Sequence, residues 1–287
     1  MNQSLAVDFL KYEALGNDFI LLDGFGGRYL PLLTSKAIKS LCDRNFGIGA
    51  DGIIFITPSS IADARMKIYN SDGSVASICG NGIRCVLRFL AEKRHIEQNC
   101  SGKIATDAGN RDFSISSDSI SVDMGIARFS SELIKTTLLG SEIDIPESVS
   151  KMHPKLIATT VDVGNRHLVV SSSVNQGEMS KIGHYLEKSD FFTDGANVEF
   201  VTIVGESEID ITVWERGVGL TKACGSGACA AVSALVHLGK IPFGKVKVNL
   251  PGGSLFISVS DNEKSKISLT MTGDARCVFA GSIKIQV

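Results

Sequence analysis

Several features are scarce in this 287-residue sequence, and each absence excludes a class of protein. No run of apolar residues reaches the roughly 18 residues that a membrane-spanning helix needs. The charges nearly balance, with 29 Lys and Arg against 31 Asp and Glu, and no long basic run supplies the positive surface that nucleic-acid binding requires. We therefore expect a protein that binds neither a membrane nor nucleic acid.

Cysteine is present, but its seven residues are odd in number and lack the dense spacing of a disulfide scaffold. Residues Met1 to Leu10 also lack the charged start, apolar stretch and small-residue cleavage site of a signal peptide. We expect a soluble, cytoplasmic protein with reduced thiols. The composition, 44% hydrophobic and 21% charged, allows real cores, and the length suits two domains of ordinary size.

Two short stretches of the chain nearly repeat each other: Cys79 to Cys85 (CGNGIRC) and Cys224 to Cys229 (CGSGAC). They lie 145 residues apart, about half of the chain, and each leads into a segment with a helical pattern. Each first cysteine is therefore expected at a helix N-terminus, where unpaired N–H groups and the helix dipole help a thiol to ionise. The duplication predicts two thiols used together, one accepting a proton while the other donates one.

Most of the chain shows the short alternating pattern of strands, and helical patterns occur at 35–44, 82–93, 179–188 and 227–238. We predict an α+β fold with two similar domains, each a curved antiparallel sheet wrapped around a central helix. The first domain is expected at 1–126, completed by a C-terminal strand at 275–287. The second is expected at 127–274, with the link in the weakly patterned stretch 128–154. The active site is expected in the cleft between the domains.

Further motifs run through the sequence in a fixed order: LGNDF at 15–19, GIGADG at 47–52, NSDGS at 70–74, Cys79 to Cys85, Gly164-Asn165 with His167, Asn197, ERG at 215–217, Ala223 to Cys229, and LPGG at 250–253. With these motifs in order, the chain resembles the diaminopimelate epimerases essentially from end to end. The resemblance implies a cofactor-independent enzyme that inverts one α-carbon of 2,6-diaminopimelate and interconverts its L,L and meso forms. That reaction is a step towards lysine and, in many bacteria, peptidoglycan.

Inverting an α-carbon without pyridoxal phosphate requires removal of a very weakly acidic proton. Two groups on opposite faces of that carbon solve the stereochemical problem, because one deprotonates while the other reprotonates. Thiols suit both roles when their pKa is close to the working pH. We assign Cys79 and Cys224 as the catalytic pair. The alternative, a small buried thiol in a glycine-rich loop, would explain either motif alone but not the duplication.

The residues after each cysteine are predicted to bind the substrate's α-carboxylate. Glycines let backbone N–H groups approach a ligand closely and converge on an anion. The N–H groups of Gly80 and Asn81 on one side, and of Gly225 and Ser226 on the other, would hold the carboxylate and stabilise its growing charge. The alternative is a simple strand-to-helix turn in each place.

The far end of the substrate carries a second ammonium and carboxylate. Arg216 can make a two-pronged contact with a carboxylate, and Glu215 offers a countercharge for an ammonium. Four asparagines resemble the substrate-binding asparagines of the family: Asn17, Asn70, Asn165 and Asn197. His167 lies near the site in the family, although packing explains a lone histidine equally well.

We expect no metal and no cofactor. The Cys-x5-Cys and Cys-x4-Cys intervals ending at Cys85 and Cys229 are not the usual zinc spacing, no histidine cluster accompanies them, and both residues are expected in the core. Cys42, Cys100 and Cys277 have no partner motif. The expected partner is a small amino-acid substrate; the oligomeric state is not fixed by the sequence, and a homodimer remains open.

Two departures from the family pattern concern selectivity. Arg166 stands where many members have proline, and Leu220 stands where many have glutamate. A racemase or epimerase of another amino acid, such as glutamate or a proline derivative, therefore remains an alternative, also as a side activity. A non-catalytic small-molecule binding protein or a thiol redox protein is a second alternative, although no Cys-x2-Cys pair supports redox work.

Overall fold

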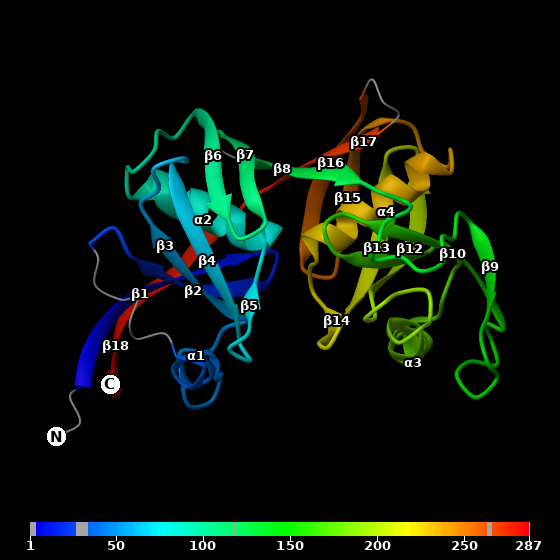
Figure 1. Ribbon diagram of the computed structural model, residues 1–287, viewed down its shortest axis with the longest axis horizontal. Coiled ribbons are helices and arrows are strands. Elements are labelled where there is room, and N and C mark those ends of the chain that lie inside the picture. The colour runs from blue at the N-terminus through cyan, green and yellow to red at the C-terminus, as the bar shows by residue number, and fades with distance from the viewer. Residues whose placement is uncertain (1–3, 27–33, 118, 263–265, 287) are drawn as a thin grey trace. The chain divides into compact units, whose positions relative to one another are not determined.

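The computed structural model describes residues 4–26, 34–117, 119–262 and 266–286 (Figure 1). The chain divides into two compact units: unit 1 comprises residues 1–123 and 273–287, and unit 2 comprises residues 124–272. The sequence analysis placed these divisions at 126/127 and 274/275. Among the residues described, no helix is both long enough and apolar enough to span a membrane.

Unit 1 contains one mixed sheet. Its strands follow one another in the sheet as β18 (Arg276–Gln286), β1 (Ser4–Ala14), β2 (Asn17–Asp23), β3 (Gly52–Thr57), β4 (Ala64–Asn70), β6 (Cys100–Thr106), β7 (Gly109–Ile115) and β8 (Ile120–Ala127). The short β5 (Val75–Ala76) pairs with β4. The pairs β2–β3 and β4–β6 are parallel, and the other neighbours are antiparallel.

Unit 2 repeats this arrangement. Its strands follow one another as β9 (Ser141–Asp144), β10 (Lys155–Asp162), β11 (Arg166–Val170), β12 (Asn197–Gly205), β13 (Glu208–Glu215), β15 (Gly244–Leu250), β16 (Gly253–Asn262) and β17 (Lys266–Gly273). The short β14 (Gly219–Thr221) pairs with β13. Here β11–β12 and β13–β15 are the parallel pairs. The predicted α+β fold with two similar halves is confirmed.

The prediction of purely antiparallel sheets is wrong. Each parallel pair is joined by a crossover that contains a helix, because two parallel strands cannot be connected by a tight hairpin. In unit 1, α1 (Ser35–Cys42) connects β2 to β3, and α2 (Gly80–Glu92) lies between β5 and β6. In unit 2, α3 (Gln176–Glu187) connects β11 to β12, and α4 (Gly225–His237) lies between β14 and β15.

One long helix packs against the sheet of each unit (Figure 1). In unit 1, α2 contacts β1, β2, β3, β4 and β18, and in unit 2, α4 contacts β10 to β13 and β16. Nearly every residue of each helix is buried, so the predicted central helices are confirmed. Burial of α4 follows from its composition, since Ala, Val, Leu and Cys occupy almost every side of the helix.

The stretch 128–154, expected to hold the link between domains, belongs to unit 2. Arg128 pairs with Asp162 of β10, and β9 pairs with β10. The stretch also contributes Ile134, Leu138 and Ile143 to the hydrophobic core that α3, β10 and β12 share. Its weak pattern reflects short pieces of structure around buried apolar residues rather than an exposed linker.

Candidate active site

Cys79 directly precedes α2 and caps that helix. Its backbone is extended, with φ −149° and ψ 113°, and its Sγ accepts a hydrogen bond from the Gly82 N–H at 3.4 Å. The thiol is half-buried. The predicted position at a helix N-terminus is therefore confirmed, and α2 begins two residues earlier than the sequence indicated because the cysteine itself is the cap.

Cys224 has the same local geometry in unit 2. It precedes α4 with φ −127° and ψ 110°, and its Sγ accepts a hydrogen bond from the Gly227 N–H, again at 3.4 Å. The Ser226 hydroxyl lies 3.5 Å from the same sulfur. Cys224 is 8% exposed, so its environment is drier than that of the half-buried Cys79.

Burial raises the pKa of the Cys224 thiol well above its ordinary value, and the charge of Glu215 acts in the same direction. The hydrogen bonds from Ser226 and Gly227 oppose this shift but are weaker. Desolvation therefore opposes the easier ionisation expected of a thiol at a helix cap, and for Cys224 it is the largest of these effects.

The predicted carboxylate-binding residues occupy the first turns of the two helices. Gly80 and Asn81 open α2, and Gly225 and Ser226 open α4. Backbone N–H groups in the first turn of a helix have no partner within that helix, and the dipole there favours an anion. The predicted residues therefore lie at helix N-termini directly beside the two cysteines, where an anion is favoured.

A hydrogen-bonded network lies behind the Cys224 site. The Nδ1 atom of buried His167 lies 2.7 Å from Oε1 of buried Glu199, and its Nε2 lies 2.9 Å from Oδ1 of Asn165. The Asn165 amide donates to the Ser226 hydroxyl at 3.2 Å. Asn165, expected to bind substrate, thus connects His167 to the residue beside Cys224. Glu199 was not predicted, although a charged residue within the apolar strand VEFV was a usable signal.

The arginine predicted to bind the distal carboxylate belongs to a second network. Nη1 of Arg216 donates to Oδ2 and to the backbone oxygen of Asp194, at 2.7 and 2.8 Å. The same Asp194 Oδ2 accepts from Arg166 at 3.2 Å. The Arg216 N–H donates to Oδ1 of Asn197, which holds the turn after β13 against the start of β12. Asp194, an exposed aspartate before β12, carried no sequence signal.

Glu215 ends β13 and is half-buried. Its Oε1 accepts a hydrogen bond from Thr221 on β14 at 2.6 Å. Leu220, the residue that departs from the family pattern, is exposed on the same short strand. The structure thus places Glu215 and Leu220 on the paired strands β13 and β14, which precede Cys224 in the chain.

The two remaining asparagines belong to unit 1. Asn17 opens β2 and Asn70 ends β4, where its amide donates to the Ser74 hydroxyl at 2.9 Å. Phe19 on β2 lies opposite Gly52 on β3, which lies opposite Asn70, so the register brings both asparagines to the same end of the sheet. The predicted residues therefore divide between the units: Asn17, Asn70, Cys79, Gly80 and Asn81 lie in unit 1, and the others in unit 2.

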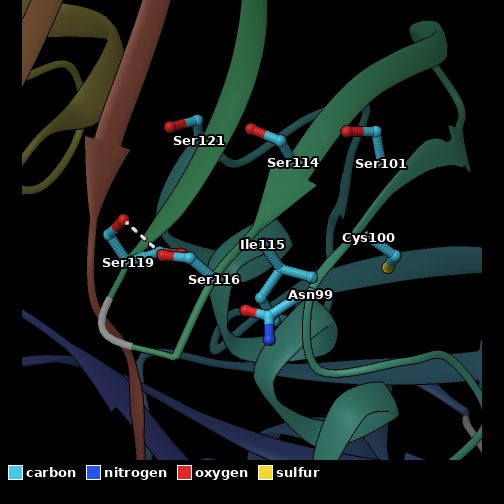
Figure 2. Close-up of a pocket in the computed structure, with 8 residues that line it drawn as sticks. All are labelled: Asn99, Cys100, Ser101, Ser114, Ile115, Ser116, Ser119 and Ser121. Carbon is cyan, nitrogen blue, oxygen red and sulfur yellow. Dashed lines mark hydrogen bonds between the residues drawn. The ribbon is translucent and has the colours of Figure 1, made fainter.

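A surface hollow of about 330 Å³ lies elsewhere in unit 1. Figure 2 shows its lining, which consists of five serines on or next to β6, β7 and β8 together with Asn99, Cys100 and Ile115. None of the predicted site residues lines it, and burial raises the pKa of the Cys100 thiol. Its lining, as far as the structure describes it, contains no charged side chain to hold an amino acid, so we do not assign it to the active site. Within the described ranges, no group of three or more His, Cys, Asp or Glu side chains could hold a metal ion.

Comparison with known proteins decides the family. The family model for diaminopimelate epimerase matches residues 9–130 and 159–278. A diaminopimelate epimerase of Synechocystis sp. (strain ATCC 27184 / PCC 6803 / Kazusa) is 41% identical over 289 residues, which cover 98% of this chain and 100% of that protein. The chain belongs to the diaminopimelate epimerase family. The chloroplastic diaminopimelate epimerase of Oryza sativa subsp. japonica is 40% identical over 96% of this chain and 80% of its own length.

Solved structures share the fold of this family member at much lower identity. A hydroxyproline epimerase from Agrobacterium vitis aligns with a TM-score of 0.74 at 15% identity, covering 100% of this chain and 93% of that chain. A PhzF-family phenazine biosynthesis protein of Bacillus anthracis aligns with a TM-score of 0.73 at 16% identity, covering 99% and 100%. These likenesses establish the two-repeat fold, and they do not bear on the substrate.

Proposed function

We propose that this chain is a diaminopimelate epimerase that interconverts L,L- and meso-2,6-diaminopimelate with two thiols. The observation that carries the proposal is the duplicated site. In each repeat a cysteine follows a short strand and caps the buried helix that comes next. It occurs in a chain about 40% identical, over nearly its whole length, to diaminopimelate epimerases. The product would supply lysine synthesis and, where it is made, peptidoglycan.

In the proposed reaction, the thiolate of one cysteine removes the proton from the α-carbon. The electron pair left on that carbon spreads into the α-carboxylate, where the N–H groups of the two helix N-termini stabilise the charge. The other cysteine then donates its proton to the opposite face, so the two cysteines exchange protonation states in each turnover. Burial raises the pKa of Cys224 and so favours the protonated thiol, which is the state required of the donor. In the reverse direction the roles are exchanged.

The proposal assigns the distal end of the substrate to unit 2. Arg216 would exchange its contact with the exposed Asp194 for the substrate's distal carboxylate, since a guanidinium binds a carboxylate with two parallel hydrogen bonds. Glu215, already near the thiol, would accept from an ammonium group. Asn197 fixes the backbone of Arg216 and so positions this end of the site.

Exchange of the α-proton with solvent tests the reaction directly. In deuterium oxide with a reducing agent present, L,L-diaminopimelate should gain deuterium at Cα and convert to the meso form. A panel of other amino acids, examined under the same conditions, defines the selectivity. If the purified protein exchanges none of them, the proposal is wrong, and a non-catalytic binding function takes its place.

Oxidation tests whether the two thiols work on one carbon. We predict reversible inactivation by a mild oxidant together with a Cys79–Cys224 cross-link in the peptide map, since two thiols that reach one substrate can approach to disulfide distance. Inactive oxidised protein without this cross-link would contradict the two-thiol assignment. Cofactor independence is a separate prediction: activity should survive chelators and show no visible absorbance band of a Schiff base.

A further inference from the structure

The two units differ in what lies beneath the helix that follows each cysteine. A Cβ added to Gly82 of α2 would lie 2.9 Å from Cδ1 of Ile54, and one added to Gly227 of α4 would lie 2.9 Å from Oε1 of Glu199. Gly52 is the first residue of β3 that pairs with β2, and Asn197 is the first residue of β12 that pairs with β11. Ile54 and Glu199 each lie two residues further along these strands. The same place in the fold therefore holds an isoleucine in one unit and a glutamate in the other.

The neighbouring position differs in the same way. Phe19 pairs with Gly52 in unit 1, and His167 pairs with Asn197 in unit 2, so His167 occupies the place of Phe19. All four side chains are buried, and Glu199 and His167 are fully buried. Burying two ionisable groups has a large desolvation cost, which an apolar pair avoids. Unit 1 shows that the fold needs no such pair, so its presence in unit 2 calls for another explanation.

The hydrogen bonds that lead from His167 through Asn165 to Ser226 all donate in the same direction, towards Cys224. The Asn165 amide nitrogen donates to Ser226, so its oxygen faces His167, and Nε2 of His167 must carry a hydrogen to donate to it. A second hydrogen bond of the imidazole joins Nδ1 of His167 to Oε1 of Glu199. Because Ser226 already accepts from Asn165, its own hydroxyl hydrogen is available to donate to Sγ of Cys224.

We propose that Glu199 is a positioning residue that acts through His167, Asn165 and Ser226 to aim a hydroxyl donor at the sulfur of Cys224. Glu199 is the hydrogen-bond partner of Nδ1 and fixes the orientation of the imidazole, so that Nε2–H points at the Asn165 oxygen, and each later donor is oriented by the one before it. The donor stabilises the thiolate that Cys224 must become after it gives up its proton. The inference rests on the proposed two-thiol function for its purpose, but the network itself is a property of unit 2.

The groups that face Cys224 have opposing effects on its pKa. Burial is the largest effect and raises the pKa, followed by the charge of Glu215. The Ser226 hydroxyl and the Gly227 N–H lower it. The negative charge of Glu199 acting directly on the sulfur would raise it. The direct effect of Glu199 and its effect through Ser226 therefore have opposite signs, and an experiment can separate them.

The test replaces the pair by its unit 1 counterpart in the double variant Glu199→Ile/His167→Phe, which keeps the site apolar and filled. Alkylation of Cys224 by iodoacetamide is followed against pH by peptide mass spectrometry, with Cys79 in the same sample as the internal reference. Loss of the aimed donor should raise the pH midpoint of Cys224 alkylation by about one unit. At pH values below that midpoint, the rate of Cys224 alkylation relative to that of Cys79 should therefore fall by about tenfold. Ser226→Ala should produce the same change, and Ser233→Ala, a buried hydroxyl elsewhere on α4, should produce none.

Combining the changes decides the route. If Glu199 acts through Ser226, adding Glu199→Ile/His167→Phe to Ser226→Ala raises the midpoint no further, because only the direct effect of Glu199, which has the opposite sign, is left to lose. A midpoint that falls when the pair is replaced in the presence of Ser226, or that rises equally with and without Ser226, would overturn the proposal. Calorimetry verifies that each variant folds; if the double variant does not, Asn165→Leu breaks the same chain at the next residue and must raise the midpoint. Alkylation needs no turnover, so a wild-type protein without epimerase activity would refute the proposed function and leave this test intact.

Discussion

Unit 1 and unit 2 share strand order, crossover helices and a cysteine cap, yet they differ beneath the cap. Unit 1 places Phe19 and Ile54 there, and unit 2 places His167 and Glu199 in the same register. Since the two frameworks are otherwise alike, the fold explains what the units have in common, and the differences point to function. A buried ionisable pair would be weak evidence in an isolated domain, because such pairs rarely stabilise a protein. The apolar counterpart in unit 1 makes it informative.

The same comparison separates the two thiols. Cys79 is half-buried, whereas Cys224 is buried, burial raises the pKa of its thiol, and its sulfur lies 3.5 Å from the Ser226 hydroxyl. Two thiols that serve one carbon need equal backbone geometry, because each must reach its own face. They do not need equal surroundings. The shared backbone geometry and the distinct environments are therefore both compatible with the proposed pair, in which each thiol acts in turn as acid and base.

The largest expected effect tests what the units share. Cys79→Ala and Cys224→Ala should each abolish epimerisation, with a loss of at least about a thousandfold, because inversion needs a proton-transfer group on each face. The rate of conversion of L,L- to meso-diaminopimelate measures this loss. Cys229→Ala and Cys85→Ala, at similar places further along the two helices, serve as controls and should retain turnover. Normal activity in either Cys79→Ala or Cys224→Ala would contradict the assignment of these two cysteines as the proton-transfer pair.

The second effect concerns the glycines that face Ile54 and Glu199. In Gly82→Ala the new methyl group meets the flexible end of Ile54, and the better helix propensity of alanine, worth about 1 kcal/mol, offsets the contact. In Gly227→Ala it meets the hydrogen-bonded carboxylate of Glu199 and the side chain of Val213 at 3.2 Å. Displacement of that network should lower the epimerisation rate constant by about ten- to a hundredfold.

Thermal unfolding and steady-state kinetics of the two glycine variants provide the measurement. We expect Gly227→Ala to be less stable than Gly82→Ala as well as less active, because overpacking against a fixed neighbour costs about 1–3 kcal/mol. Equal effects in the two variants would mean that the carboxylate beneath α4 yields as easily as an isoleucine. The difference between Ile54 in unit 1 and Glu199 in unit 2 would then have no effect on how the helix above it packs.

The sequence predicted what the units share better than what distinguishes them. The duplicated cysteine motifs placed both helices within two residues, because glycine and cysteine near the start of an apolar helix are local signals. Glu199 was missed because its partner His167 lies 32 residues away and meets it only through the parallel pairing of β11 and β12. The parallel pairs themselves were missed because alternation of apolar residues is the same in both strand directions. The two-residue β5 is too short to show a pattern.

A third prediction concerns the charge of Asp18, near the start of β2. Asp18, one residue before Phe19, accepts two hydrogen bonds from Arg44 and pairs with the buried Lys11 at 2.6 Å. Burial would raise the pKa of Asp18, but the hydrogen bonds from Arg44 and Lys11 lower it below its ordinary value of 3.8. Asp18→Asn leaves Lys11 without its countercharge and should reduce the free energy of unfolding by about 1–3 kcal/mol.

The pH dependence of this loss follows from the sign of the shift. A carboxyl whose pKa is lowered in the folded state stabilises the protein above its unfolded pKa, and that stabilisation is lost as the pH falls through the folded value. The gap between wild type and Asp18→Asn, measured by denaturant unfolding, should be full above about pH 4 and narrow at lower pH. A gap that stays constant to pH 2 would show that the charge of Asp18 is not what stabilises unit 1.

The smallest effect tests the corresponding position of unit 2, where Arg166 lies one residue before His167. Two guanidinium groups, those of Arg166 and Arg216, share the single carboxylate of Asp194. The cluster carries one positive charge in excess, and an anionic substrate group can neutralise it. Arg166 therefore gives the site a second cation for a distal carboxylate, independent of the ammonium contact at Glu215. We predict that L-glutamate, which has the carboxylate but no distal ammonium, is racemised slowly, because missing contacts of about 1–3 kcal/mol weaken a reaction without abolishing it.

Arg166→Gln sharpens this prediction because it removes the excess charge and leaves the thiols and Arg216 in place. Deuterium exchange at Cα of L-glutamate should fall by about tenfold, the equivalent of one charged contact, whereas exchange of diaminopimelate should fall less because Glu215 still holds its distal ammonium. Arg276→Gln, an exposed ion-paired arginine in unit 1, is the matched control and should change neither rate. If wild-type protein exchanges glutamate no faster than Cys79→Ala does, the second cation does not broaden the substrate range. The contact of Arg166 with Asp194 would then be its only role that the structure shows in this cluster.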